Sequence, residues 1–142
     1  MDMQGLTLLP LGQGTGMPGL RGDFTPPSRF VRAAFISVNA LPAPDASQGV
    51  YLLFHLMNNF DIPIGIARST DSTGKLYCDY TQFTAVRDPT NLRYYLRTFK
   101  DQTIRMIDMK QLNFDSDKAL TIDIAGFKQS AEDVSSQLTP IK

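Results

Sequence analysis

The chain has 142 residues, with 14 acidic and 14 basic side chains, so its formal net charge is zero. A chain of this length holds one hydrophobic core but not two ordinary domains, and its balanced charge provides no basic field for nucleic acid or an anionic membrane. We therefore expect one domain, or part of one, that binds neither nucleic acid nor a membrane.

The cysteine and histidine content limits redox and metal chemistry. Cys78 is the one cysteine and His55 the one histidine, so neither an internal disulfide nor a zinc site of Cys and His ligands can form. The first residues do not have the pattern of a secretory signal, and no apolar run reaches the roughly 18 residues of a membrane span. We predict no cofactor and no metal. As written, the chain carries no targeting signal and is expected to be cytoplasmic.

The N-terminal part predicts a short strand, a glycine-rich loop and a helix. Residues Leu6 to Leu11 are apolar, although a proline limits such a strand to an edge or a terminus. Five glycines within positions 12–22 favour a loop that approaches other backbone or a ligand closely. A helix is predicted from about 26 to 39, with Thr25 as its hydroxyl cap and Pro26 in its first turn. Its predicted buried stripe consists of Phe30, Val31, Ala34, Phe35 and Val38.

A second helix is predicted from 46 to 59. Prolines break the chain before it, and Asp45 followed three residues later by Gln48 resembles a capping box. The apolar residues then recur at helical spacing and predict a buried stripe of Val50, Leu53, Phe54, Met57 and Phe60.

The pattern changes to β-structure after the second helix. We predict a strand at Ile62–Ala67, a polar turn at Ser69–Lys75, and three antiparallel strands at Cys78–Arg87, Leu92–Phe99 and Thr103–Met109. One face of this sheet is expected to carry Tyr94, Leu96, Ile104 and Met106.

The last part of the chain predicts one more strand and a tail. The strand is expected at Leu120–Ile124, and the polar residues 125–142 are expected to form a tail with at most one helical turn. Helices followed by strands, without βαβ alternation, predict an α+β fold with a mainly antiparallel sheet.

Three short stretches resemble nucleotide-binding or calcium-binding motifs, but each one lacks a residue or a structural context that its motif requires. Gly14–Gly19 has the letters of a dinucleotide fingerprint, but the prolines delay the helix to about residue 26, too late to face a pyrophosphate. Lys75 is followed by Leu76, where a P-loop needs Ser or Thr. Asp115 begins a turn that lacks the later ligands of a calcium loop.

His55 and Cys78 are the other candidate reactive groups. We interpret His55 as a packed or hydrogen-bonded helix residue, and a general base as the alternative. Nothing cationic lies near Cys78 in the sequence to lower its pKa, so a structural role is favoured for it.

Arg29 is the most informative side chain of the sequence. A cation in the first turn of a helix opposes the helix dipole, so its position requires a compensating anion. One hypothesis is a salt bridge to Asp23, and the other is an arginine presented to a substrate carboxylate, a nucleophile or an oxyanion. Arg32 is expected on the same polar face of the helix.

Several blocks of the sequence resemble one enzyme family. The first is GQGTGMPGLRGDFTPPSRFVRAAF, at Gly12–Phe35. The later blocks, in the same order and at similar spacing, are FHLMNNFDIPIG, YCDYTQFTAV and LRYYLRTFKDQTIRMIDM. Together they are similar to the choloylglycine hydrolases and penicillin V acylases, which are amide hydrolases of the N-terminal-nucleophile superfamily.

The resemblance implies that residues 1–124 form the C-terminal portion of such an enzyme, within a four-layer αββα sandwich, followed by the tail 125–142. It implies cleavage of linear amide C–N bonds, such as those of conjugated bile salts, penicillin V or N-acyl homoserine lactones. The family's nucleophilic cysteine has no counterpart here, and Arg29 alone carries over from its catalytic set. The expected partner is a small amide substrate once an N-terminal half completes the site, with a homo-oligomer possible. The alternative is an inactive remnant or interaction module of the same fold.

Overall fold

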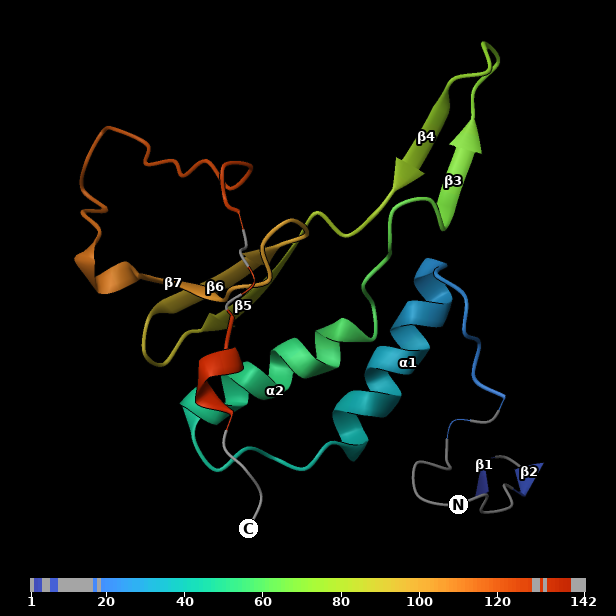
Figure 1. Ribbon diagram of the computed structural model, residues 1–142. Coiled ribbons are helices and arrows are strands. Elements are labelled where there is room, and N and C mark those ends of the chain that lie inside the picture. The colour runs from blue at the N-terminus through green and yellow to red at the C-terminus, as the bar shows by residue number, and fades with distance from the viewer. Residues whose placement is uncertain are drawn as a thin grey trace. The chain divides into compact units, whose positions relative to one another are not determined.

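The computed structural model describes residues 2–3, 6–7, 17, 19–128, 131 and 133–138. It divides the chain into two compact units, one of residues 1–44 and 55–80 and the other of residues 45–54 and 81–142. Figure 1 shows the elements in chain order, two helices followed by antiparallel strands. The predicted α+β class and its order of elements are thus confirmed.

The first unit begins with a short strand pair, β1 (Asp2–Met3) and β2 (Leu6–Thr7). The predicted strand at Leu6–Leu11 is confirmed for the two residues of β2, and its remainder lies outside the described residues.

Helix α1 (Pro26–Asn39) has the predicted bounds. Two prolines occupy its first turn, where the missing N–H groups leave no hydrogen bond unmade. Thr25 precedes the helix in an extended conformation, but its hydroxyl does not cap it, so this part of the prediction was wrong. The hydroxyl instead bonds to the carboxylate of Asp23.

The burial of α1 is the reverse of the prediction. Its buried residues are Ser28 and Arg32, whereas Phe30, Val31 and Val38 are exposed. Arg32 finds two carbonyl acceptors in the preceding loop, which compensates for the desolvation of its charge. The apolar residues do recur on one side of the helix, as their periodicity predicted. That side is exposed, however, and the side with Ser28 and Arg32 is buried.

Helix α2 (Ala46–Asn58) begins directly after the predicted capping residue, Asp45. The N–H of Gln48 donates to the carboxylate of Asp45 at 2.8 Å, and the Gln48 side-chain amide donates to its other oxygen at 3.0 Å. Within the second unit, Val50 and Phe54 of this helix are buried as predicted. The expected burial of Leu53 and Met57 was wrong, because both side chains are exposed.

Residues 62–66 form a turn and not the predicted strand. Pro63 cannot donate to a ladder, and Gly65 has φ +92°, which reverses the chain. The strand β3 (Ala67–Thr70) begins later and pairs with β4 (Leu76–Asp79) in a hairpin. The predicted polar turn is thus shorter, and the carboxylate of Asp71 accepts hydrogen bonds from two backbone N–H groups within it.

The second unit contains a three-stranded antiparallel sheet in the order β5-β6-β7, as Figure 1 shows. Its strands are β5 (Phe83–Asp88), β6 (Arg93–Thr98) and β7 (Arg105–Asp108). The three predicted antiparallel strands are confirmed, except that the first one is divided between β4 and β5.

The register of this sheet corrects the predicted face. Tyr95 lies opposite Val86 on one side and Met106 on the other, so these three share a face, while Tyr94 and Leu96 lie on the opposite one. The expected grouping of Tyr94 and Leu96 with Met106 was therefore wrong. The core of the unit forms on the Tyr95 face, from Val50, Phe54 and Val86 with Tyr95 and Ile104 packed against them.

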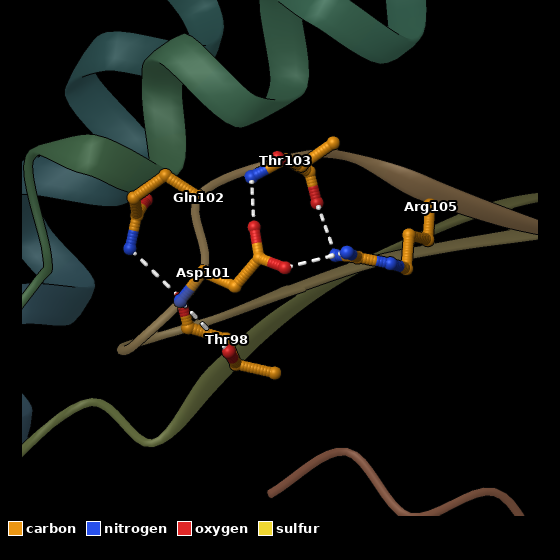
Figure 2. A network of polar contacts seen from close by, with 5 residues as sticks. All are labelled: Thr98, Asp101, Gln102, Thr103 and Arg105. Atoms are coloured by element: carbon orange, nitrogen blue, oxygen red, sulfur yellow. Dashed lines mark hydrogen bonds and ion pairs between the residues drawn. The ribbon is translucent and has the colours of Figure 1, made fainter. Parts of the chain in front are cut away.

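The turn between β6 and β7 is built around Asp101, whose side chain is fully buried (Figure 2). Its carboxylate accepts the N–H of Thr103 at 2.9 Å and forms an ion pair with Arg105. The backbone N–H of Asp101 donates to the hydroxyl of Thr98 at 3.1 Å, and the Gln102 side chain donates to the Thr98 carbonyl at 2.9 Å. The hydrogen bond from Arg105 keeps the pKa of Asp101 below its ordinary value of 3.8.

The chain after β7 has little regular structure. A 3-10 turn, η1 (Met109–Gln111), follows the sheet directly. The predicted strand at Leu120–Ile124 was wrong, since these residues form no ladder. The described part of the tail contains one helical turn, η2 (Ser135–Gln137), as predicted.

Candidate active site at the start of helix α1

Arg29 lies in the first turn of α1 and is half-buried. Its backbone N–H donates to the carbonyl of Thr25 at 3.0 Å, which closes the first turn of the helix. The predicted helix start therefore positions this side chain at the end of the glycine-rich loop, within the first unit.

Asp23 has its own set of partners, and among the described residues it forms no ion pair with Arg29. The Asp23 carboxylate accepts the N–H of Thr25 at 2.9 Å, the hydroxyl of Thr25, and the hydroxyl of Ser28 at 2.9 Å. These hydrogen bonds lower the pKa of Asp23 to about 2, and those from Thr25 make the largest contribution. Of the two hypotheses for Arg29, the salt bridge to Asp23 was therefore wrong.

Arg32 holds the loop to the helix. One guanidinium nitrogen, Nη1, donates to the carbonyl oxygens of Arg21 and Asp23, both at 2.8 Å. The guanidinium also lies 5.8 Å from the centre of the Phe60 ring. This arginine is 7% exposed, so of the two arginines in the SRFVR block it is the structural one.

The contrast between the two arginines defines the candidate site. The Nε of Arg29 is buried and has no hydrogen-bond partner among the described residues. A buried donor without an acceptor is unfavourable, and a guanidinium offers a planar set of N–H donors suited to carboxylates and oxyanions. Chemically, Arg29 can bind or orient an anion, a thiolate or a polarised carbonyl oxygen.

The other candidate residues form no cluster. His55 is exposed, which corrects the prediction of a packed or hydrogen-bonded side chain. Cys78 is a half-buried free thiol on β4. No group of three His, Cys, Asp or Glu side chains in the described ranges could hold a metal ion. Of the dinucleotide-like stretch Gly14–Gly19, only Met17 and Gly19 lie within the described residues.

The second unit contains a hollow that sequence reasoning missed. It has a volume of about 410 Å³ and lies beside the β5–β6 turn, where it is lined by Arg87, Asp88, Pro89, Leu92, Arg93, Tyr94 and Met109. The turn is fixed by Asp88, which accepts the N–H of Asn91 at 3.0 Å, and by Leu92, whose φ of 56° is unusual for a residue other than glycine. The turn-forming residues Asp-Pro-Thr-Asn at 88–91 were the one sequence signal for this hollow.

Comparison with known proteins identifies the family of the chain. Residues 1–122 match the linear amide C–N hydrolases of the choloylglycine hydrolase family. The chain belongs to this family, as its sequence blocks predicted. None of the helices within the described ranges is both long and apolar enough to cross a membrane.

The relatives are much longer than this chain. A bile salt hydrolase/transferase of Clostridium perfringens is 36% identical over 115 residues, which is 81% of this chain and 34% of that protein. A bile salt hydrolase/transferase of Bifidobacterium longum is 31% identical over 111 residues, which is 78% of this chain and 34% of that protein. The chain therefore spans about a third of the length of these relatives.

The fold is similar to that of a solved relative. The crystal structure of a mutant conjugated bile acid hydrolase from Clostridium perfringens matches with a TM-score of 0.64 and 31% identity. The match covers 95% of this chain and 40% of the other. Two helices followed by antiparallel strands thus correspond to part of an N-terminal-nucleophile hydrolase.

Proposed function

We propose that this chain is the C-terminal portion of a choloylglycine hydrolase-like enzyme that cleaves linear amide C–N bonds. The family match supports the reaction class, and the bile salt hydrolases among the relatives make conjugated bile salts the first substrates to test, before penicillin V and N-acyl homoserine lactones. In this proposal the helices and the strands belong to the layers of an αββα sandwich.

The observation that supports a role for Arg29 is its buried Nε, for which the described part of the chain offers no acceptor. In the proposed mechanism a cysteine outside residues 1–142 attacks the amide carbonyl as a thiolate, and its α-amino group carries the proton that the leaving amine takes up. The resulting thioester is hydrolysed by water to the free acid. Arg29 orients the thiolate and stabilises negative charge as the sulfur reacts.

The direct test is an assay of the chain alone and of the chain supplied with the N-terminal segment of a relative. We expect no release of glycine or taurine from conjugated bile salts by the chain alone, because its one cysteine, Cys78, is internal and has no free α-amino group beside it. Turnover by the chain alone would refute the proposal that its catalytic site is incomplete.

A second candidate function is an inactive interaction module of the same fold. The loop at Asp23 supports it, because hydrogen bonds from Thr25, Ser28 and Arg32 hold the loop within the chain itself. An inactive module predicts no turnover in either assay, and a chain that remains monomeric and stable by itself.

A further inference from the structure

The carboxylate of Asp23 accepts hydrogen bonds from neutral groups, although two arginines follow it closely in the sequence. One of its oxygens accepts the N–H and the hydroxyl of Thr25, and the other accepts the hydroxyl of Ser28 at 2.9 Å. Arg32 donates to the backbone carbonyl of Asp23 and not to its carboxylate. Among the described residues, Arg29 forms no ion pair with it either. An anionic side chain is thus bonded by two hydroxyls and one amide.

The charges alone would favour a different arrangement. Asp23 is ionised at neutral pH, because the hydrogen bonds from Thr25 and Ser28 lower its pKa to about 2. A guanidinium brings a full positive charge and a planar set of N–H donors that matches a carboxylate, whereas a hydroxyl brings one donor and no charge. An unoccupied oxygen of Asp23 would therefore attract an arginine within its reach.

Arg29 is the arginine that such an oxygen would attract. Its backbone N–H bonds to the carbonyl of Thr25 at 3.0 Å, so its backbone lies against the residue that bonds to Asp23. The Cα–Cβ bonds of a helix tilt toward its N-terminus, and for Arg29 this is the end at Asp23. Arg32 is already held, because its Nη1 bonds to two carbonyl groups. The buried Nε of Arg29, in contrast, has no acceptor among the described residues.

Ser28 is the hydroxyl that matters most for this arrangement. Its side chain is 2% exposed, and among the described residues it alone donates to the second oxygen of Asp23. Its Oγ also lies 3.1 Å from the Oγ1 of Thr25, so the two hydroxyls adjoin over the carboxylate. Alanine forms helices better than serine does, so the helix itself does not require this hydroxyl.

We propose that Ser28 and Thr25 are positioning residues for Arg29, because their hydroxyls occupy the carboxylate of Asp23 and so leave the Arg29 guanidinium to a reacting anion. The inference rests on the proposed function for the identity of that anion, a thiolate or an oxyanion. An arginine paired with Asp23 would have its charge neutralised and its donors occupied, and could not stabilise either one.

The first measurement is NMR of the Arg29 Nε–H group in the full chain. Ser28→Ala removes the donor to one oxygen of Asp23, and we expect Arg29 to pair with that oxygen and its Nε–H resonance to shift. Adding Asp23→Asn to Ser28→Ala removes the charge, so the double variant should return the resonance toward its original position. Ser37→Ala, at an exposed position of the same helix, is the matched control and should leave the resonance in place.

The second measurement is turnover of conjugated bile salts by the chain supplied with the N-terminal segment of a relative. We expect Ser28→Ala to lower kcat by a factor on the order of 10, which is less than the full loss of an oxyanion donor. The double variant with Asp23→Asn should recover most of this loss. A merely structural serine gives the opposite order, because the double variant would then be at least as impaired as Ser28→Ala.

Three results would overturn the proposal. The first is an Arg29 Nε–H resonance that Ser28→Ala leaves in place, and the second is a double variant with no higher kcat than Ser28→Ala. The third is a kcat of Ser28→Ala equal to that of Ser37→Ala. Thr25→Val, at an exposed position, removes one donor from the other oxygen of Asp23 and replaces Ser28→Ala if that variant does not fold. An unmoved Arg29 resonance in Thr25→Val overturns the proposal in the same way.

The two measurements separate this inference from the proposed function. An unaltered, completed enzyme that releases no glycine or taurine refutes the function. The NMR measurement on the chain alone still decides whether the hydroxyls keep Asp23 from pairing with Arg29.

Discussion

Arg32 binds the backbone at Asp23, nine residues earlier in the chain, through a hydrogen bond of 2.8 Å from Nη1 to the carbonyl oxygen. The same nitrogen reaches the carbonyl of Arg21, so one guanidinium fixes two peptide groups of the loop against α1. Three residues before it, the buried Nε of Arg29 finds no acceptor among the residues that the structure describes. The first prediction follows from this division of roles.

Arg32→Met is expected to destabilise the chain by about 3 kcal/mol or more, because hydrogen bonds from a charged donor contribute about 1.5–3 kcal/mol each and the two carbonyl groups lose their partner. Arg29→Met is the matched control. We expect it to change the free energy of unfolding by less than about 0.5 kcal/mol, since it removes no hydrogen bond between described side chains. Urea denaturation of both variants measures the difference, and equal destabilisation would contradict the assignment.

Asp23 provides a prediction for acid pH. Its pKa in the folded chain is about 2, lowered from an ordinary value of 3.8 by hydrogen bonds from Thr25 and Ser28. A lowered carboxyl pKa contributes stability that is fully present above the ordinary value and is lost as the pH falls toward 2. We therefore expect the amide of Thr25 to stay protected from hydrogen exchange at pH 5 and to lose protection between about pH 4 and pH 2.

Asp23→Asn tests the cause of that change. The variant has no titrating group at this position, so the protection of the Thr25 amide should no longer vary over this pH range. If the Thr25 amide of the variant still lost its protection between pH 4 and pH 2, another group would control the loop.

Asp101 gives a third prediction, for the β6–β7 turn (Figure 2). Asp101→Asn removes the ion pair of a fully buried carboxylate and weakens the hold on Arg105, whose guanidinium lies 4.1 Å from the centre of the Phe127 ring. We expect a lower melting temperature and faster hydrogen exchange at Thr103, whose N–H donates to Asp101. Asp117→Asn, at an exposed position, is the control and should melt like the unaltered chain.

Features encoded within a few residues could be predicted from the sequence. The capping pair of Asp45 and Gln48 and the prolines that start α1 act locally, and so the helix starts were predicted correctly. The β5–β7 strands were also predicted, because aromatic and β-branched residues alternate between clear turn letters.

Features that depend on distant partners could not be predicted. Burial of Arg32 depends on carbonyl groups nine and eleven residues away, and periodicity alone placed this arginine on the exposed face. Whether Met106 shares a face with Tyr95 or with Leu96 depends on the register between β6 and β7, where a shift of one residue exchanges the faces. For the candidate site, the sequence identified Arg29 but left its partner open between Asp23 and a reacting anion, because the hydroxyl groups of Thr25 and Ser28 were not considered as competing donors to Asp23.

The last prediction concerns Arg29 in the completed enzyme. If its guanidinium stabilises the reacting thiolate and the developing oxyanion, Arg29→Ala should lower kcat for conjugated bile salts by a factor on the order of 100 to 1,000, which is typical for the loss of one such donor. Arg29→Lys should recover part of this loss, because it keeps the charge but not the planar set of donors. Arg21→Ala is the control, since Arg21 is exposed and the substitution keeps the backbone carbonyl that Arg32 binds.

A merely structural Arg29 would give a different set of results. Its alanine variant would then lower the melting temperature of the complex while kcat stayed within a few-fold, and lysine would restore stability more than turnover. Measuring kcat and the melting temperature on the same preparations distinguishes the two roles. The buried Nε without an acceptor favours the catalytic one, because a donor that bonds to no described group adds little to the stability of the chain and is available to a reacting anion.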